Sequence, residues 1–183
     1  MTLGAGEAPL QAAFSLRGSK LAIEAAEPLC SKRDMSDYEA VALSPYSSYA
    51  LEGRDLRKEE IALFRTATTA EPAVAAARST DADGRSLTFV ELCGSSWYYG
   101  ASGCNVAIFA RTGESAPWTL VYDAEGADLY LDRSALVDGW PGIIALPRKG
   151  GGDEMRWTWG GSRYVVADGE AIAEGPHGAG TPQ

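Results

Sequence analysis

The feature that most constrains the fold is a series of short runs rich in β-branched and aromatic residues that begins at Arg85. Gly or Pro clusters separate several of these runs at intervals of about 8–12 residues, a spacing typical of antiparallel β-structure. The last two runs, Met155–Trp159 and 163–166, flank Gly160-Gly161-Ser162, which predicts a tight hairpin. Residues 85–168 are therefore predicted to form one antiparallel sheet or a small sandwich.

Residues 1–84 are predicted to form an N-terminal segment that packs on this β domain. Its first part has apolar residues in alternate positions on both sides of Gly18 and Ser19. Alternation around a Gly-containing turn favours a β-hairpin. The competing interpretation is a short helix through residues 10–16, where alanine is frequent.

One or two short helices are predicted between this hairpin and the β domain. Asp55 is a candidate N-cap for the first, which continues through Phe64 with near-helical apolar spacing. Pro72 stands at a tolerated first-turn position of the second, an alanine-rich stretch over residues 73–78. The predicted fold class is α+β and rich in β-structure, with an internal boundary in the polar cluster 79–84. Residues 169–183 show no pattern typical of a strand or a helix and are predicted to form a mobile tail.

The charge balance limits the classes of partner. Among 183 residues, 25 are acidic and 16 are basic, which gives a formal net charge of −9. A field of this sign repels phosphate backbones and attracts basic proteins, so we expect no nucleic-acid partner. The simpler interpretation is that the charge maintains solubility. No run approaches the roughly 18 consecutive apolar residues of a membrane span.

Three cysteines, Cys30, Cys93 and Cys104, are too few for a disulfide scaffold and lack the C-x-x-C spacing of zinc sites. Cys93 and Cys104 flank a loop rich in glycine, serine and aromatic residues, so a bridge between them is one interpretation. Three reduced, buried thiols are the other, and the odd count fits it. Spacing alone does not decide between them.

Catalytic and metal-binding patterns are weak. His177 is the single histidine and lies in the predicted tail, so a Ser–His or Cys–His pair has no rigidly held base. We therefore expect a protein that is not an enzyme and needs no cofactor. Four acids around one predicted turn invite comparison with a calcium site: Asp123, Glu125, Asp128 and Asp132. Their spacing differs from the helix–loop–helix calcium loop, and acids beside glycine are ordinary turn chemistry, so no metal site is predicted.

Trp97, Tyr98 and Tyr99 are the strongest candidates for a binding surface. If this stretch is extended, neighbouring side chains point to opposite sides, so at least one ring points away from the core. Exposed Trp and Tyr beside Ser and Gly are typical of recognition surfaces. The alternative is that the rings pack over a sheet edge with their polar tips in water. Trp140, which follows Gly139, is the fourth candidate binding residue.

Residues 93–164 also carry four short motifs: Gly103-Cys104, Val121-Tyr122-Asp123-Ala124-Glu125-Gly126, Gly139-Trp140 and Trp159-Gly160-Gly161-Ser162-Arg163-Tyr164. In these motifs the chain resembles uncharacterised exported bacterial proteins rich in β-structure. The resemblance implies export, for example to the periplasm, and a small β domain, and it assigns no activity. The first seven residues have neither the basic nor the apolar region of a signal peptide, so the cytoplasm is the alternative location.

These patterns favour a non-enzymatic protein-binding module, an inhibitor or immunity-type protein for a basic partner. The acidic charge would steer such a partner, and the aromatic stretch 97–99 would anchor it. The alternative is a structural or accessory subunit of a bacterial envelope assembly, in which the same stretch docks to a larger complex.

Overall fold

The computed structural model describes residues 13–17, 20–24, 35, 37–148 and 153–167. The chain divides into two compact units, Met1–Asp37 and Tyr38–Gln183. In the first unit, strands β1 (Ala13–Arg17) and β2 (Lys20–Glu24) pair in antiparallel fashion. The predicted N-terminal hairpin is therefore confirmed.

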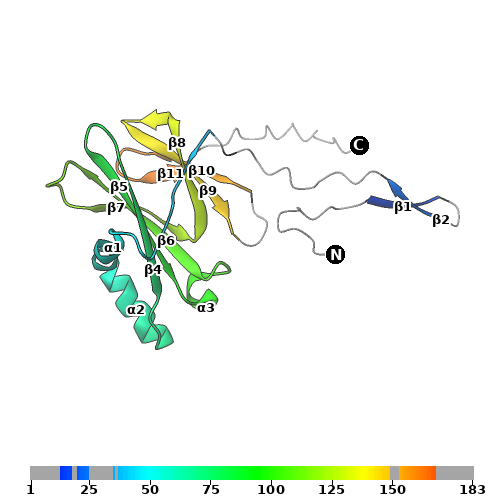
Figure 1. Cartoon of the computed structure of the whole chain (residues 1–183), viewed down its shortest axis with the longest axis horizontal. Helices are drawn as coiled ribbons and strands as arrows, with labels where there is room; N and C mark the ends of the chain where they lie inside the picture. The colour runs from blue at the N-terminus through cyan, green and yellow to red at the C-terminus, as the bar shows by residue number, and fades with distance from the viewer. Residues whose placement is uncertain (1–12, 18–19, 25–34, 36, 149–152, 168–183) are drawn as a thin grey trace, which may run out of the picture. The chain divides into compact units, whose positions relative to one another are not determined.

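The second unit is built on two antiparallel sheets (Figure 1). The four-stranded sheet has the order β4 (Ala73–Thr80), β5 (Arg85–Cys93), β6 (Cys104–Thr112) and β7 (Thr119–Glu125). The five-stranded sheet has the order β11 (Tyr164–Val166), β10 (Met155–Trp159), β9 (Trp140–Pro147), β8 (Ala127–Val137) and β3 (Glu39–Ala40). The predicted β-rich α+β class is confirmed, and so is the closing β10–β11 hairpin.

The two sheets face each other across the main core. Phe89 and Ile108 from the four-stranded sheet pack with Leu131 and Ile143 from the five-stranded sheet, and each is at most 1% exposed. The other face of β5 is buried as well, because helices cover it. A strand buried on both faces needs no polar alternation, which explains the nearly continuous apolar run in this part of the sequence.

Three short helices cover the outer face of the four-stranded sheet: α1 (Ala50–Leu56), α2 (Lys58–Thr68) and α3 (Ser96–Tyr99). Ile61 and Phe64 of α2 pack on Val90 of β5 in a second apolar core. Short helices before the β domain are thus confirmed. Asp55, however, lies inside α1, and the residue that precedes α2 is Arg57, so the predicted N-cap is wrong.

The predicted helix over residues 73–78 is also wrong, because these residues belong to β4. This strand pairs with β5 in continuous register along its whole length. Small side chains suit the position, since a Cβ added at Gly53 of α1 would lie 3.5 Å from the Cβ of Ala76. Strand pairing and close helix packing outweigh the helix propensity of alanine here. Within the predicted boundary 79–84, the last residues form the turn between β4 and β5.

Arg78 ties α1 to the sheet. Its guanidinium lies over the rings of Tyr49 and Trp118, 4.3 and 4.8 Å from their centroids, and pairs with the carboxylate of Glu52 on α1. Glu52 also accepts a 2.6 Å hydrogen bond from Nε1 of Trp118. Burial alone would raise the pKa of the Glu52 carboxyl, but the hydrogen bonds from Arg78 and Trp118 lower it overall.

Candidate functional site

The candidate site is the connection between β5 and β6, residues 94–103, which we call the Trp97 loop. Cys93 and Cys104 lie opposite each other at its base and form a disulfide, with their Cα atoms 4.1 Å apart. Of the two interpretations of the cysteines, the bridge is therefore the one observed. It holds the two ends of the loop together. Cys30 lies outside the described residues.

Hydrogen bonds hold the Trp97 loop in one conformation. The Ser95 hydroxyl accepts a bond from the N–H of Tyr98 and so caps α3. The N–H of Ser102 donates a 2.6 Å bond to Oε1 of Glu125 on β7. Gly100, with φ of 84°, packs so close to Glu125 that an added Cβ would lie 3.0 Å from its carboxylate, which makes glycine the suitable residue there.

The three aromatic residues of the loop have different surroundings, because α3 is a helical turn rather than an extended stretch. Tyr99 is 8% exposed and stacks on Phe64, with ring centroids 5.2 Å apart. Tyr98 meets the same Phe64 ring edge to face, also at 5.2 Å. Trp97 is 78% exposed. Two of the rings therefore anchor the loop, and the third is presented to solvent.

Trp140, the fourth candidate, lies in the core between the sheets. It begins β9, is 6% exposed, and stacks on Trp159 with ring centroids 5.0 Å apart. It does not offer an exposed ring like that of Trp97, because the hairpin strands around it bury most of its surface. It borders a groove that lies away from the Trp97 loop.

A polar network that the sequence did not indicate lies beside Tyr99. Arg57, 5% exposed, donates hydrogen bonds to Asp123 at 3.1 Å and to Asn105 at 2.6 Å, and Asn105 donates to Asp123 at 2.7 Å. The Tyr99 hydroxyl is buried and has no hydrogen-bond partner within the described part of the chain. Burial raises the pKa of Tyr99, and the nearby Glu60 carboxylate raises it further. Arg57 is 48 and 66 residues from its partners, so no local pattern could have revealed the network.

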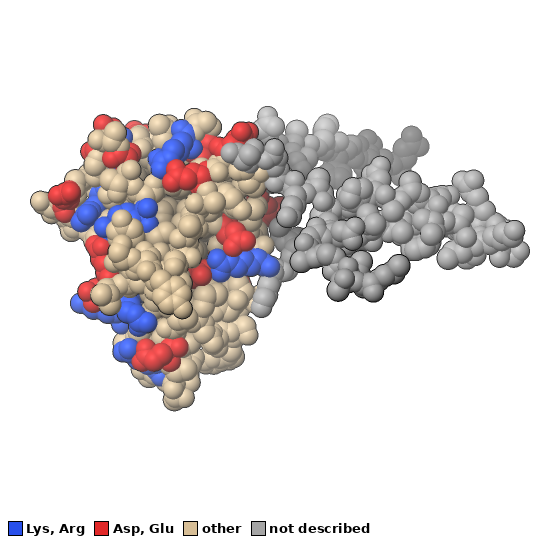
Figure 2. All heavy atoms as spheres, in the orientation of Figure 1, with Lys and Arg blue, Asp and Glu red and all other residues tan. Residues whose placement is uncertain are grey.

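Most arginines of the fold are neutralised locally, and Figure 2 shows acidic and basic side chains next to each other on the visible face. The pairs include Arg65–Glu71, Arg85–Asp81, Arg133–Glu39 and Arg148–Glu91. Two carboxylates beside the Trp97 loop, Glu60 and Glu125, have no ion pair among the described residues. Loss of solvent raises the pKa of the Tyr98 hydroxyl, and Glu60 raises it further, which places this acid next to the loop.

The four acids predicted around one turn do not converge on a single point. Their partners are Arg57 for Asp123, the Ser102 N–H for Glu125, Arg148 for Asp128, and Ser134 for Asp132. Within the described residues, Glu91 lies close enough to Cys93 and Cys104 for the three to hold a metal ion. The two sulfurs are bonded to each other, however, and a metal ligand must be a thiolate. His177 lies outside the described residues.

Comparison of the chain with protein-family models, with curated proteins and with solved structures found no match. In the part of the chain that the structure describes, no helix has the length and apolar character needed to cross a membrane.

Proposed function

We propose that the protein is a non-enzymatic protein-binding module whose Trp97 loop contacts a basic partner. The observation that carries the proposal is the exposure of 78% of Trp97 on a loop closed by the Cys93–Cys104 disulfide. A large indole surface in water is unfavourable, and burial in a partner would remove that cost. Trp is also among the residues that contribute most to affinity at protein interfaces.

The support of the loop favours tight binding. Tyr98 and Tyr99 pack on Phe64, and the Ser102 N–H is bonded to Glu125, so the backbone around Trp97 is already ordered. A preorganised loop loses little conformational entropy on association, and more of the contact energy therefore appears as affinity.

The charge of the surroundings favours a basic partner. Glu60 and Glu125 flank the loop, and the whole chain has a net charge of −9. Such a field accelerates association with a cationic surface. A Lys or Arg side chain of the partner would also interact favourably with the face of the Trp97 ring.

An inhibitor or immunity-type protein is the specific role that we propose, because a preordered loop with acidic neighbours is suited to covering a basic surface of a partner. The disulfide supports a location outside the cytoplasm, in the periplasm or beyond the cell, since disulfides persist in oxidising compartments.

A second candidate is an accessory subunit of an envelope assembly, and one observation favours it. On its outer side, β7 has no neighbouring strand within the described residues, and Leu120 on this strand is 49% exposed. An open edge of this kind can pair with a strand of a larger complex. Size-exclusion chromatography separates the two candidates, because a stable, well-behaved monomer argues against an obligate subunit.

The proposed function is tested with the purified chain immobilised as bait, in wild-type form and as Trp97→Ala, at low and at high salt. The wild type is expected to retain a basic protein at low salt and to lose most of it at high salt. Leu136→Ala is the matched control, because Leu136 is 56% exposed on β8 and the proposal assigns it no contact. Retention that salt does not weaken would exclude the electrostatic part of the proposal.

A further inference from the structure

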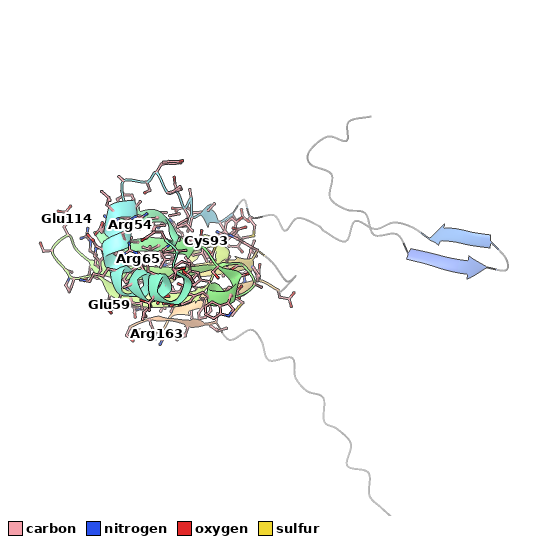
Figure 3. The ribbon with its side chains drawn as sticks, turned by 90° about the horizontal axis from the view of Figure 1, so that it is seen from below. Arg54, Glu59, Arg65, Cys93, Glu114 and Arg163 are labelled. Atoms are coloured by element: carbon pink, nitrogen blue, oxygen red, sulfur yellow. A yellow bond between two sulfur atoms is a disulfide. The ribbon has the colours of Figure 1, made fainter. Side chains whose placement is uncertain are left out.

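A groove of about 550 Å³ lies at the end of the sandwich opposite the disulfide. It is bordered by three connections, the β6–β7 loop, the β8–β9 turn and the β10–β11 turn, and Trp140 and Trp159 line it. Strand β6 runs from Cys104 at the disulfide to Thr112 at the groove. Figure 3 labels Cys93 and, on the β6–β7 loop at the far side, Glu114. The groove is therefore separate from the Trp97 loop.

Its aromatic wall is firmly held. The rings of Trp140 and Trp159 are stacked, with centroids 5.0 Å apart and planes 30° apart, and Trp159 meets the Tyr164 ring edge to face at 5.5 Å. The Tyr164 hydroxyl donates a 2.9 Å hydrogen bond to the carbonyl of Pro141 and is buried. The indoles are thus fixed before any ligand arrives, as in preformed small-molecule sites.

The rim of the groove provides hydroxyl groups and one carboxylate for hydrogen bonding. Thr112, Thr119 and Ser162 bring hydroxyls, and Asp138 brings a carboxylate. The one cationic residue among the described residues of the lining is Arg111. Its guanidinium lies 4.3 Å from the Trp118 ring centroid, and its Nη1 donates to the carbonyl of Glu114, whereas its buried Nε has no hydrogen-bond partner among the described residues.

We propose that this groove binds a neutral carbohydrate. The C–H face of a sugar ring is apolar and would pack on Trp159, which is only partly buried and is backed by the buried Trp140. The sugar hydroxyls would exchange hydrogen bonds with the Thr and Ser hydroxyls and donate to Asp138. Asp138 repels an anionic ligand, which favours a neutral one. The volume lies in the range of about 300–1,000 Å³ that is usual for small-molecule sites.

A lysine or arginine side chain of a basic protein is the competing occupant, since a cation also binds an indole face beside a carboxylate. The three hydroxyls around the rim favour the sugar, because sugar hydroxyls both donate to and accept from them, whereas an ammonium or guanidinium group can only donate.

The experiment records the indole N–H signals of ¹⁵N-Trp-labelled protein by NMR, assigned by replacing one Trp at a time with Phe. Chitotriose, cellotriose and maltotriose are added separately at millimolar concentrations. The signals of Trp140 and Trp159 are expected to shift with at least one of these probes, while that of Trp97 stays in place. A lysine pentapeptide is the comparison probe.

Two variants make the result specific. Trp159→Ala removes one of the two indole rings that line the groove and is expected to weaken sugar binding at least about tenfold. Asp138→Asn keeps a residue that tolerates the positive φ of 51° at this turn, so the fold is retained. The affinity for the sugar is expected to fall several-fold. Trp97→Ala is the control and should bind the sugar as the wild type does.

The proposal is overturned if none of the three oligosaccharides shifts the Trp140 and Trp159 signals. It is equally overturned if the lysine pentapeptide shifts them more strongly than every sugar, or if Asp138→Asn and Trp159→Ala, both folded, bind as tightly as the wild type. Because the groove does not include the Trp97 loop, each of these results leaves the proposed protein-binding function to be judged separately.

Discussion

Tyr99 stacks on Phe64, with ring centroids 5.2 Å apart and ring planes 9° apart. This contact joins α3 to α2, and it belongs to the apolar core on the outer face of the four-stranded sheet. Trp97 lies two residues earlier on the same helical turn and remains exposed. The presentation of Trp97 thus depends on the burial of its neighbour.

Phe64→Ala tests this dependence. Phe64 is fully buried, so the truncation leaves a cavity under α3 and is expected to lower the free energy of unfolding by about 3–5 kcal/mol. Urea denaturation measures the change. Leu63→Ala is the matched control, because Leu63 is 60% exposed on the same helix and its truncation should change stability by less than about 0.5 kcal/mol. Equal losses in the two variants would contradict the packing described here.

Tyr99→Phe separates the ring of Tyr99 from its hydroxyl. The hydroxyl is buried without a hydrogen-bond partner among the described residues, so its removal ends an uncompensated desolvation cost. We expect the variant to be as stable as the wild type or up to about 1 kcal/mol more stable in thermal and urea unfolding. A clear loss of stability would mean that the hydroxyl makes a favourable interaction in the folded protein.

Removal of the disulfide should loosen the Trp97 loop. The bridge joins residues 11 positions apart, and the double variant Cys93→Ala, Cys104→Ala is expected to lose about 2–3 kcal/mol of stability. Hydrogen exchange should accelerate more in residues 94–103 than in the strands that flank them, where it reflects only the loss of global stability. Dithiothreitol should reproduce the effect in the wild type and have no effect on the variant. Unchanged exchange in the loop after reduction would show that other contacts hold it.

Glu52 should contribute to the dependence of stability on pH. Hydrogen bonds from Arg78 and Trp118 lower the pKa of its carboxyl in the folded state below the ordinary value of 4.5. The ionised form is therefore favoured by folding, and its contribution is present above pH 4.5 and is lost as the pH falls through the lowered pKa. Glu52→Gln should be less stable than the wild type at pH 7, with the difference shrinking below pH 4.5. Glu59→Gln serves as the control, because Glu59 is exposed on α2. A stability difference that is the same at pH 7 and pH 3 would contradict this assignment.

Much of the β domain could be predicted from the sequence, because its signals are local. Gly160 and Gly161 sit at a hairpin turn between two runs of large residues, and both the turn and the strands follow from short-range chemistry. The alanine-rich pattern of residues 73–78 predicts a helix and is wrong, since their β-structure depends on pairing with β5 and on the close approach of Gly53, neither of which a local pattern contains.

The candidate site could be predicted in part. The run Trp97 to Tyr99 marks the loop, but the sequence does not say which ring is exposed, because that depends on Phe64, which is more than thirty residues away. The network around Arg57 depends on partners still more distant in the chain and was not predicted. The sequence predicts Trp140 as a binding residue, but the structure places it in the core, where it packs on Trp159, and no local pattern contains this contact.

The most direct test of the central claim is the affinity of the captured basic protein, once purified, for wild-type chain, Trp97→Ala and Leu136→Ala, measured by titration calorimetry. We predict that Trp97→Ala weakens binding at least about 30-fold, the loss typical of a dominant interface residue, while Leu136→Ala binds as the wild type does. The three proteins should have the same unfolding temperature to within about 2 °C. If Trp97→Ala binds the partner as tightly as the wild type, the Trp97 loop is not the contact surface and the account is contradicted.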